Sequence, residues 1–359
     1  MMRLMLILTL FVGFHLQASA QKPAILAYYS GSVEGLDSFK AEQFTHIIYC
    51  FGHVKDDKLF LRRNRDTLLI QKMVGLKKIN KNLKVLLSLG GWGGCAPCSD
   101  AFSTDKGRKT FAQSVRELTD FFGTDGIDLD WEYPAISGYP GHTFKPEDKD
   151  NFTALVRDLK QVLGRKKQVT FAAGGFEKFL KESVDWKAVM PYVSYVNLMT
   201  YDLTSGFSVV TGHHTPLYSN ASQKESGNNC VQWLVKNGVK RSKLILGAAF
   251  YTRMWENVEP VNNGLYQSGK FKGALPYSRF SQQFTPENGY ALYWDEVSKA
   301  PYAYNAKEKI FATFDDKRSI EEKARYVKQQ KLGGIMFWQL GEDKANNGLL
   351  QVMYDVLRK

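Results

Sequence analysis

Three acidic side chains alternate along one short apolar segment of the sequence, at Asp128, Asp130 and Glu132. Side chains two residues apart point to the same side of a β-strand, so a strand here would gather the three carboxyl groups on one face. Their mutual repulsion raises some of their pKa values and holds a proton in the cluster at neutral pH. Because Glu132 is nearest the carboxyl end of the strand, we predict that it is a general acid.

Two other interpretations of this segment are an acidic edge strand that faces solvent and a calcium loop. A calcium loop needs closely spaced oxygen ligands and a glycine at its turn, whereas apolar strand residues flank these carboxyl groups. The alternation turns Trp131 to the opposite face, where we expect it to pack in the core. Asp125, at the start of the segment, is expected to have a structural role.

The elements that must position this segment are eight short apolar runs, which we predict to be strands. They are residues 24–30, 45–51, 84–90, 126–132, 168–173, 194–200, 243–251 and 333–339. Helical patterns lie between most of them, with apolar stripes along 111–122 and 152–162. Eight such units predict an α/β fold, a closed (β/α)8 TIM barrel. The alternative, an open doubly wound sheet, lacks a GxGxxG turn after its first strand.

The chain of 359 residues is longer than such a barrel, which usually takes about 250. Most of the excess lies between the seventh and eighth strands, where residues 254–312 predict a small α+β insertion. Residues 1–20 combine Arg3, an apolar run and a small-residue site ending at Ala20, which is typical of a signal peptide. We therefore expect a secreted or periplasmic domain over residues 21–359, cleaved near Ala20. No later stretch is apolar enough to cross a bilayer.

The 48 Lys and Arg residues against 36 Asp and Glu give a formal net charge of +12. The basic residues are scattered and the chain is expected to be exported, so we expect no nucleic-acid partner. A monomer is expected.

Two of the four cysteines, Cys95 and Cys98, form a CxxC pair. In an exported protein we predict a local disulfide between them rather than a redox site. A zinc site would need a second ligand pair, and the sequence has none at suitable spacing. Cys50 and Cys230 are expected to be buried as small hydrophobic residues. We predict no metal and no cofactor.

Residues 125–132 read Asp-Gly-Ile-Asp-Leu-Asp-Trp-Glu, and they match the DxxDxDxE signature of glycoside hydrolase family 18, the chitinases and their relatives. Four further segments resemble motifs of that family in the same chain order: Ser88–Gly91, Met199–Asp202, Tyr251–Arg253 and Trp338. Residues 254–312 resemble the family's chitinase insertion domain. The resemblance covers nearly all of residues 21–359, although Thr124 stands where Phe often precedes the signature.

This resemblance implies retaining hydrolysis assisted by the substrate's own acetamido group. Glu132 would protonate the leaving glycosidic oxygen. Asp130 would accept the acetamido N–H, and Tyr201 would donate to the acetamido oxygen. Asp128 would share a proton with Asp130. Asp202 would bind the sugar near the scissile bond.

The resemblance and the positions of strand ends also indicate which residues bind substrate. The expected residues are Tyr28, Phe51, Gly91, Trp92, Tyr133, Met199, Tyr251, Arg253 and Trp338. Trp338 would form the floor under the distorted sugar, and Trp92 would stack on the leaving-group side. For any single aromatic residue, the alternative is ordinary core packing.

The implied function is that of a secreted chitinase acting on chitin or chitooligosaccharides. One alternative is an endo-β-N-acetylglucosaminidase that cleaves N-glycans, although a deep groove beside the insertion favours a long polymer. A second is a non-catalytic chitinase-like lectin, against which the intact Glu132 argues. The sequence leaves open the cleavage mode, processivity and use of the sequons at Asn151 and Asn220.

Overall fold

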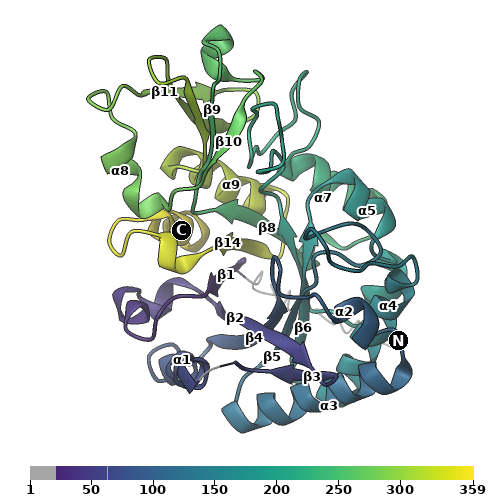
Figure 1. Cartoon of the computed structure of the whole chain (residues 1–359). Helices are drawn as coiled ribbons and strands as arrows, with labels where there is room; N and C mark the ends of the chain where they lie inside the picture. The colour runs from purple at the N-terminus through teal and green to yellow at the C-terminus, as the bar shows by residue number, and fades with distance from the viewer. Residues whose placement is uncertain (1–21, 63) are drawn as a thin grey trace, which may run out of the picture.

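The barrel predicted from the sequence is present in the computed structural model, which describes residues 22–62 and 64–359 (Figure 1). The expected signal peptide, residues 1–20, lies outside the described residues. Within these residues eight parallel strands follow one another around the barrel, and the first pairs with both the second and the last. They are β1 (Ala24–Tyr29), β2 (His46–Lys55), β4 (Lys84–Gly90), β5 (Gly126–Asp130), β6 (Gln168–Gly174), β7 (Tyr195–Met199), β8 (Leu244–Ala249) and β14 (Gly334–Trp338). Each overlaps one predicted run, although β2 extends to Lys55, beyond the predicted 45–51, and β5 and β8 end two residues earlier than predicted.

Helices between the strands cover the outside of the barrel (Figure 1). The α-helices of the barrel are α1 (Asn64–Gly75), α2 (Cys98–Ala101), α3 (Asp105–Phe122), α4 (Asp148–Leu163), α5 (Glu177–Glu182), α6 (Trp186–Val189), α7 (Gly227–Lys236), α9 (Lys317–Gln329) and α10 (Leu349–Arg358). A short strand, β3 (Lys58–Phe60), extends β2 as an antiparallel hairpin. The two predicted apolar stripes bury Phe111 and Val115 on α3, and Phe152 and Leu155 on α4.

Short 3-10 helices join several of these elements. They are η1 (Gly35–Ser38), η2 (Ala41–Gln43), η3 (Leu76–Lys78), η4 (Arg241–Lys243), η5 (Val261–Gly264), η6 (Tyr277–Arg279) and η7 (Leu340–Glu342).

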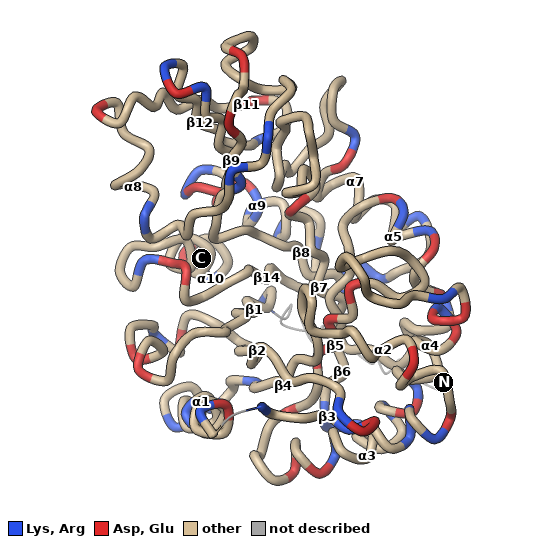
Figure 2. Tube along the Cα trace, in the orientation of Figure 1, with Lys and Arg blue, Asp and Glu red and all other residues tan. Residues whose placement is uncertain are grey.

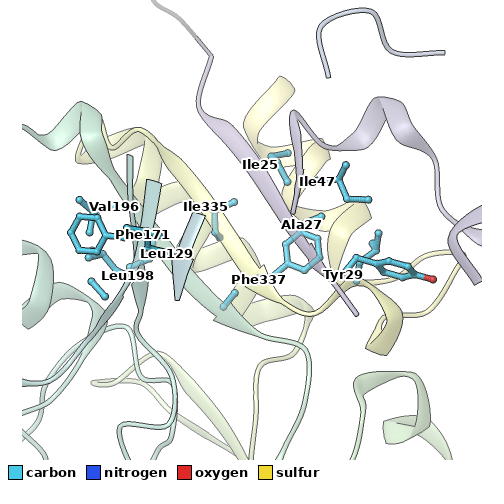
Figure 3. Close-up of a cluster of buried hydrophobic side chains, with 14 of the residues drawn as sticks. Ile25, Ala27, Tyr29, Ile47, Leu129, Phe171, Val196, Leu198, Ile335 and Phe337 are labelled. Atoms are coloured by element: carbon cyan, nitrogen blue, oxygen red, sulfur yellow. The ribbon is translucent and has the colours of Figure 1, made fainter. Parts of the chain in front are cut away.

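The strands bury apolar side chains on both faces, as a parallel sheet requires. Figure 3 shows the outward layer, in which side chains of β1, β5, β6, β7 and β14, among them Leu129 and Phe337, pack toward the helices. The inward layer is smaller and contains Tyr28, Cys50 and Met336. Polar side chains share this interior with it, and they build the site described below.

The insertion predicted at 254–312 is a small antiparallel sheet in the described part of the chain. Its order is β10-β9-β13-β12-β11. The elements are β9 (Arg253–Glu256), β10 (Lys270–Gly273), α8 (Phe280–Gln283), β11 (Ala291–Asp295), β12 (Ala300–Asn305) and β13 (Ile310–Thr313). A core of its own around Trp255, Tyr304 and Phe311 holds it together. It stands beside the barrel next to β8 and β14 (Figure 1).

Charged residues of both signs are interspersed over the helices and loops (Figure 2). Many form exposed pairs within one helix, such as Arg325 with Glu321 on α9, and such pairs contribute little to stability. Among the residues that the structure describes, no helix has the length and apolar character needed to span a membrane.

Trp131 provides a test of the predicted alternation along β5. It is 4% exposed and its ring lies 5.5 Å from that of Phe102 and 6.3 Å from that of Phe152. Trp131→Ala should lower the free energy of unfolding by about 3–5 kcal/mol, because it removes a large buried ring. Trp92, which is 47% exposed, is the matched control, and Trp92→Ala should cost under about 1 kcal/mol. Equal losses in urea unfolding would contradict this orientation of β5.

Candidate active site

Asp128 lies inside the barrel at 0% exposure, and strands on both sides of β5 supply its hydrogen bonds. The strand register places Ser88 of β4 and Thr170 of β6 directly beside it. Its Oδ2 accepts from Tyr28 Oη at 3.0 Å and Ser88 Oγ at 2.9 Å. Its Oδ1 accepts from Thr170 Oγ1 at 2.6 Å and Asn197 Nδ2 at 3.0 Å. Burial raises the pKa of Asp128, and these bonds oppose that rise.

Asp130 is the next inward residue of β5, and it lacks such support. It is 4% exposed, and no protein atom of the described residues hydrogen-bonds its Oδ1. Burial raises the pKa of Asp130 well above its ordinary value, and the charges of Glu132 and Asp128 raise it further. Burial and the neighbouring carboxyl groups therefore favour the protonated form of Asp130, and its Oδ1 is an open acceptor. The four bonds to Asp128 come from neutral side chains, and none comes from Asp130. The sharing of a proton between Asp128 and Asp130 therefore stays a prediction.

Glu132 follows the end of β5 and is partly exposed. Burial raises the pKa of Glu132 to about 7; a hydrogen bond with Tyr133 opposes this rise and the charge of Asp202 adds to it. At neutral pH a large fraction of Glu132 therefore carries a proton. A carboxyl group with such a pKa at the open end of a barrel is suited to general acid–base chemistry.

Tyr201 and Asp202 follow the end of β7. The Tyr201 hydroxyl contacts only a weak acceptor among the described residues, the Met336 Sδ at 3.9 Å. The Arg253 guanidinium donates from Nε and one terminal nitrogen to the two oxygens of Asp202, at 2.6 Å each. The Nδ1 atom of buried His214 lies 3.6 Å from Asp202 Oδ1.

The charge of Asp202 follows from these contacts. Burial would raise the pKa of Asp202, but the two hydrogen bonds from Arg253 and the nearby His214 imidazole outweigh burial and hold that pKa below its ordinary value. The surroundings of Asp202 thus favour its ionised form, whereas burial favours the protonated forms of Asp130 and Glu132. The site therefore combines proton donors with one fixed negative charge.

The aromatic residues expected at the strand ends fall into two groups. Tyr28 and Tyr251 are buried, whereas Trp338 at the end of β14 is partly exposed. The ring of Phe51 stacks on Trp338, with centroids 5.4 Å apart and planes at 13°, and Tyr28 lies 6.0 Å away on a tilted plane. These rings hold Trp338 at the open end of the interior. Met199 is buried in the same inward layer.

Gly91 is required by packing. Its φ is +74°, and a Cβ atom there would lie 2.4 Å from the ring of Phe51. Its N–H donates to the carbonyl of Asp130 at 2.9 Å. A side chain at position 91 would therefore collide with the Phe51 ring, which stacks on Trp338.

Trp92 belongs to a surface cluster of aromatic rings. Its ring centroid lies 6.4 Å from Tyr133, 5.4 Å from Tyr139 and 6.1 Å from Phe207. Tyr139 is 39% exposed and Phe207 69% exposed. Loops after β4, β5 and β7 supply these residues, which we call the aromatic cluster at Trp92.

Sequence analysis missed Tyr139 and Phe207 in this cluster. It named Tyr28 and Ser88 for other reasons, but it missed Thr170 and Asn197, the other two donors to Asp128. The two aromatic residues lie in loops without periodicity, so no sequence signal marks them. Thr170 and Asn197 do have a sequence signal, because alternation along their strands places their side chains on the inward face of the barrel. Nothing in the sequence distinguishes His214.

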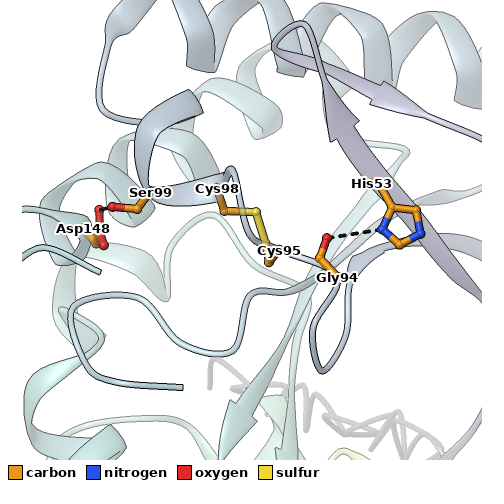
Figure 4. Close-up of a disulfide and its surroundings, with 6 residues drawn as sticks. All are labelled: His53, Gly94, Cys95, Cys98, Ser99 and Asp148. Atoms are coloured by element: carbon orange, nitrogen blue, oxygen red, sulfur yellow. Dashed lines mark hydrogen bonds between the residues drawn. A yellow bond between two sulfur atoms is a disulfide. The ribbon is translucent and has the colours of Figure 1, made fainter. Parts of the chain in front are cut away.

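The predicted disulfide between Cys95 and Cys98 is present (Figure 4). It lies in the loop that carries Trp92. Next to it, His53 Nδ1 is 3.2 Å from the carbonyl oxygen of Gly94. These contacts anchor the loop against β2. Cys50 and Cys230 are free and buried, as predicted.

Residues 24–343 match the family model described as glycosyl hydrolases family 18. Chitinase A1 of Niallia circulans is 32% identical over 299 residues, which are 77% of this chain but 43% of that protein. Chitotriosidase-1 of Mus musculus is 32% identical over 324 residues, 83% of this chain and 67% of that protein.

Solved structures are similar over nearly the entire chain. The structure of a family 18 N-acetylglucosaminidase from Paenibacillus barengoltzii aligns with a TM-score of 0.85 and 36% identity. The alignment covers 93% of this chain and 99% of that one.

The ionisation of Glu132 is the property of the site that most directly tests this geometry. Carboxyl ¹³C NMR should give a midpoint of about pH 7 for Glu132. Asp202→Asn should lower that midpoint, because it removes a negative charge that favours the protonated form. Asp120→Asn, on the outer surface of α3, should leave it unchanged. A midpoint near that of an ordinary glutamate, or one insensitive to Asp202→Asn, would contradict the electrostatics described here.

Proposed function

We propose, from the premise that this chain belongs to glycosyl hydrolase family 18, that it hydrolyses β-1,4-linked N-acetylglucosamine in chitin and chitooligosaccharides. The match to the family model over residues 24–343 establishes the family. The observation that carries the proposal is the pairing of Glu132, with a pKa of about 7, and buried Asp130, with an open acceptor. A glycoside with an acetamido group has a glycosidic oxygen that can accept the Glu132 proton and an N–H that can donate to Asp130.

In the proposed reaction Glu132 donates its proton to the glycosidic oxygen as the bond to the anomeric carbon breaks. The acetamido oxygen of the same sugar attacks that carbon, which yields a cyclic oxazolinium ion. Water then attacks the anomeric carbon and gives its proton to the Glu132 carboxylate. The two displacements return the product with retained configuration, and Glu132 regains its proton.

Asp130 and Tyr201 suit the orientation of the acetamido group. Asp130 Oδ1 accepts the acetamido N–H, which occupies the acceptor that the protein leaves open. The Tyr201 hydroxyl donates to the acetamido oxygen in place of its weak contact with Met336. Both bonds hold the acetamido oxygen in line with the anomeric carbon. Such orientation lowers the activation barrier, because the entropy cost of aligning the two atoms is met when the substrate binds.

Asp202 contributes in two ways. Its negative charge adds to the effect of burial in favouring protonated Glu132 before the reaction, and it stabilises the positive charge that develops on the sugar. The pair with Arg253 leaves Asp202 33% exposed, so the carboxylate can also accept a sugar hydroxyl. Asp128, held by its donors, keeps β5 and hence Asp130 in place.

Binding is assigned to aromatic surfaces on the two sides of Glu132. The Trp338 ring, supported by Phe51, forms the floor for the sugar that reacts. The aromatic cluster at Trp92 provides flat faces for the leaving-group side, where sugar C–H groups stack. The disulfide at Cys95 stabilises the loop that carries this surface.

A second candidate within the same family is release of single N-acetylglucosamine residues. It is favoured by the similarity to the N-acetylglucosaminidase from Paenibacillus barengoltzii. The same carboxyl groups would perform this reaction, and only the position of cleavage along the polymer differs.

We also propose that the protein acts outside the cytoplasm. The support is the signal-peptide pattern of residues 1–20 together with the Cys95–Cys98 disulfide, which suits an oxidising compartment. Cleavage near Ala20 would leave a catalytic domain of residues 21–359.

Substrate range is tested by a product time-course with mass spectrometry. Chitohexaose should be cleaved, whereas cellohexaose and fully deacetylated chitohexaose should be inert, because they lack the acetamido group. Comparable turnover of the deacetylated oligomer would refute assistance by the substrate. Accumulation of monomer alone would support the N-acetylglucosaminidase, and cleavage of an N-glycan instead of chitohexaose would refute the chitinase.

Glu132→Gln tests the proton donor. The amide keeps the shape of the side chain but cannot transfer a proton, so kcat should fall at least about 100-fold. Binding of chitohexaose by calorimetry should persist. Glu182→Gln, an exposed change on α5, is the control and should be neutral. A Glu132→Gln variant that retained more than a tenth of wild-type kcat would exclude this role.

A further inference from the structure

The segment His213–Thr215 connects the active site with the insertion. All three residues are buried, and each side chain lies near a different carboxyl group. The carboxyl groups are those of Asp295, Asp202 and Asp315. The distances are 3.1 Å for His213 Nε2, 3.6 Å for His214 Nδ1 and 3.2 Å for Thr215 Oγ1. Asp295 ends β11 of the insertion, so one short segment touches both the insertion and the site.

The third of these contacts belongs to a fully buried ion pair. Lys323 Nζ of α9 lies 2.6 Å from Asp315 Oδ2, and the two side chains are 1% and 0% exposed. Lys323 Nζ also donates to Thr215 Oγ1 at 2.5 Å. Asp315 lies two residues after the end of β13, the last strand of the insertion. The Lys323 ammonium group of α9 therefore contacts both the end of the insertion, at Asp315, and segment His213–Thr215, at Thr215.

This ion pair also reaches the carboxyl ends of β7 and β8. The N–H of Ala249, the last residue of β8, donates to Asp315 Oδ2 at 3.0 Å. The Thr215 hydroxyl accepts from Lys323, and two acceptors share its single proton: the carbonyl oxygen of Thr200 and Asp315 Oδ2, each 3.2 Å away. Thr200 directly precedes Tyr201, and Ala249 comes two residues before Tyr251. The pair thus holds the two strand ends that carry the acetamido-binding side of the site.

Stability alone does not account for charges at this place. Removing a lysine and an aspartate from water is energetically costly, and well-packed neutral residues often replace such pairs without loss of stability. The ion pair does supply directional hydrogen bonds that neutral packing lacks. We propose that Lys323 and Asp315 are positioning residues for Tyr201 and Asp202, acting through Thr215, in the reaction proposed above.

The proposal makes kinetic demands that a purely structural role does not. Tyr201 and Asp202 act mainly on the transition state, so their displacement should lower kcat more than it raises KM. The Asp202 carboxylate favours the protonated form of Glu132. A displaced Asp202 should therefore move the basic limb of the pH profile to lower pH. The kinetic part of the proposal rests on the proposed function.

The main test variant combines Lys323→Met with Asp315→Asn. The pair of changes removes both charges, so neither is left buried without its partner, and the amide oxygen of Asn can still accept from Ala249. The matched control is Arg325→Gln with Glu321→Gln, which removes an exposed ion pair from the same helix. Thr215→Val is a second variant of nearly equal volume that deletes the hydroxyl and leaves the ion pair intact.

Each variant is assayed with chitohexaose and by ¹⁹F NMR of 3-fluorotyrosine introduced at Tyr201, which needs no substrate. The double variant and Thr215→Val should each lose at least about 10-fold in kcat, shift the basic limb downward and move the Tyr201 resonance. The control should match wild type in all three measurements.

Wild-type kcat and an unmoved resonance in a folded double variant would overturn the proposal, and so would the same result for Thr215→Val if the double variant fails to fold. If wild type does not cleave chitohexaose, the proposed function is wrong and the resonance alone decides: a shift in both test variants supports the positioning role, and no shift refutes it.

Discussion

A carboxyl group enclosed in a barrel must find its hydrogen bonds in the walls, and this requirement at Asp128 organises the site. Donors from β1, β4, β6 and β7 meet its two oxygens, so strands distant in sequence must be in one register for the bonds to form. That register fixes β5. Asp130 is then buried with no hydrogen-bond donor to its Oδ1, and Glu132 lies partly exposed at the open end of the barrel. Asp128 has four hydrogen-bond donors and is structural, whereas the Oδ1 of Asp130 has none and is available to a ligand.

Much of the framework could be predicted because its signals are local. The eight strands are apolar runs with clear boundaries, and the turn of Trp131 away from the carboxyl groups follows from alternation alone. The insertion stood out as excess length between two strands, and its sheet spans Arg253–Thr313, close to the predicted 254–312. Glu132 was identified by its position in the acidic segment and by the family motif.

The remaining features depend on contacts between residues far apart in the chain. Asn197 bonds Asp128 across 69 positions and Arg253 pairs with Asp202 across 51. No periodic pattern encodes such pairs. Their consequences are also nonlocal, since the pKa of Glu132 reflects burial by other strands and the charge on Asp202. Phe207 was invisible for a different reason: an exposed ring in an irregular loop has no pattern until another loop is placed against it.

The boundaries of the insertion limit how it can be exchanged. It begins at Arg253, which pairs with Asp202, and the chain leaves it through Asp315, which bonds Ala249 and Lys323. The residues at the two boundaries of the insertion, Arg253 and Asp315, are therefore bonded to residues of the barrel. A chimera that imports the insertion of another protein preserves the chemistry only if the crossover points lie inside these two residues. Grafting is consequently confined to the middle of the sheet and its loops, where residues can change without removing the bonds to Asp202, Ala249 and Lys323.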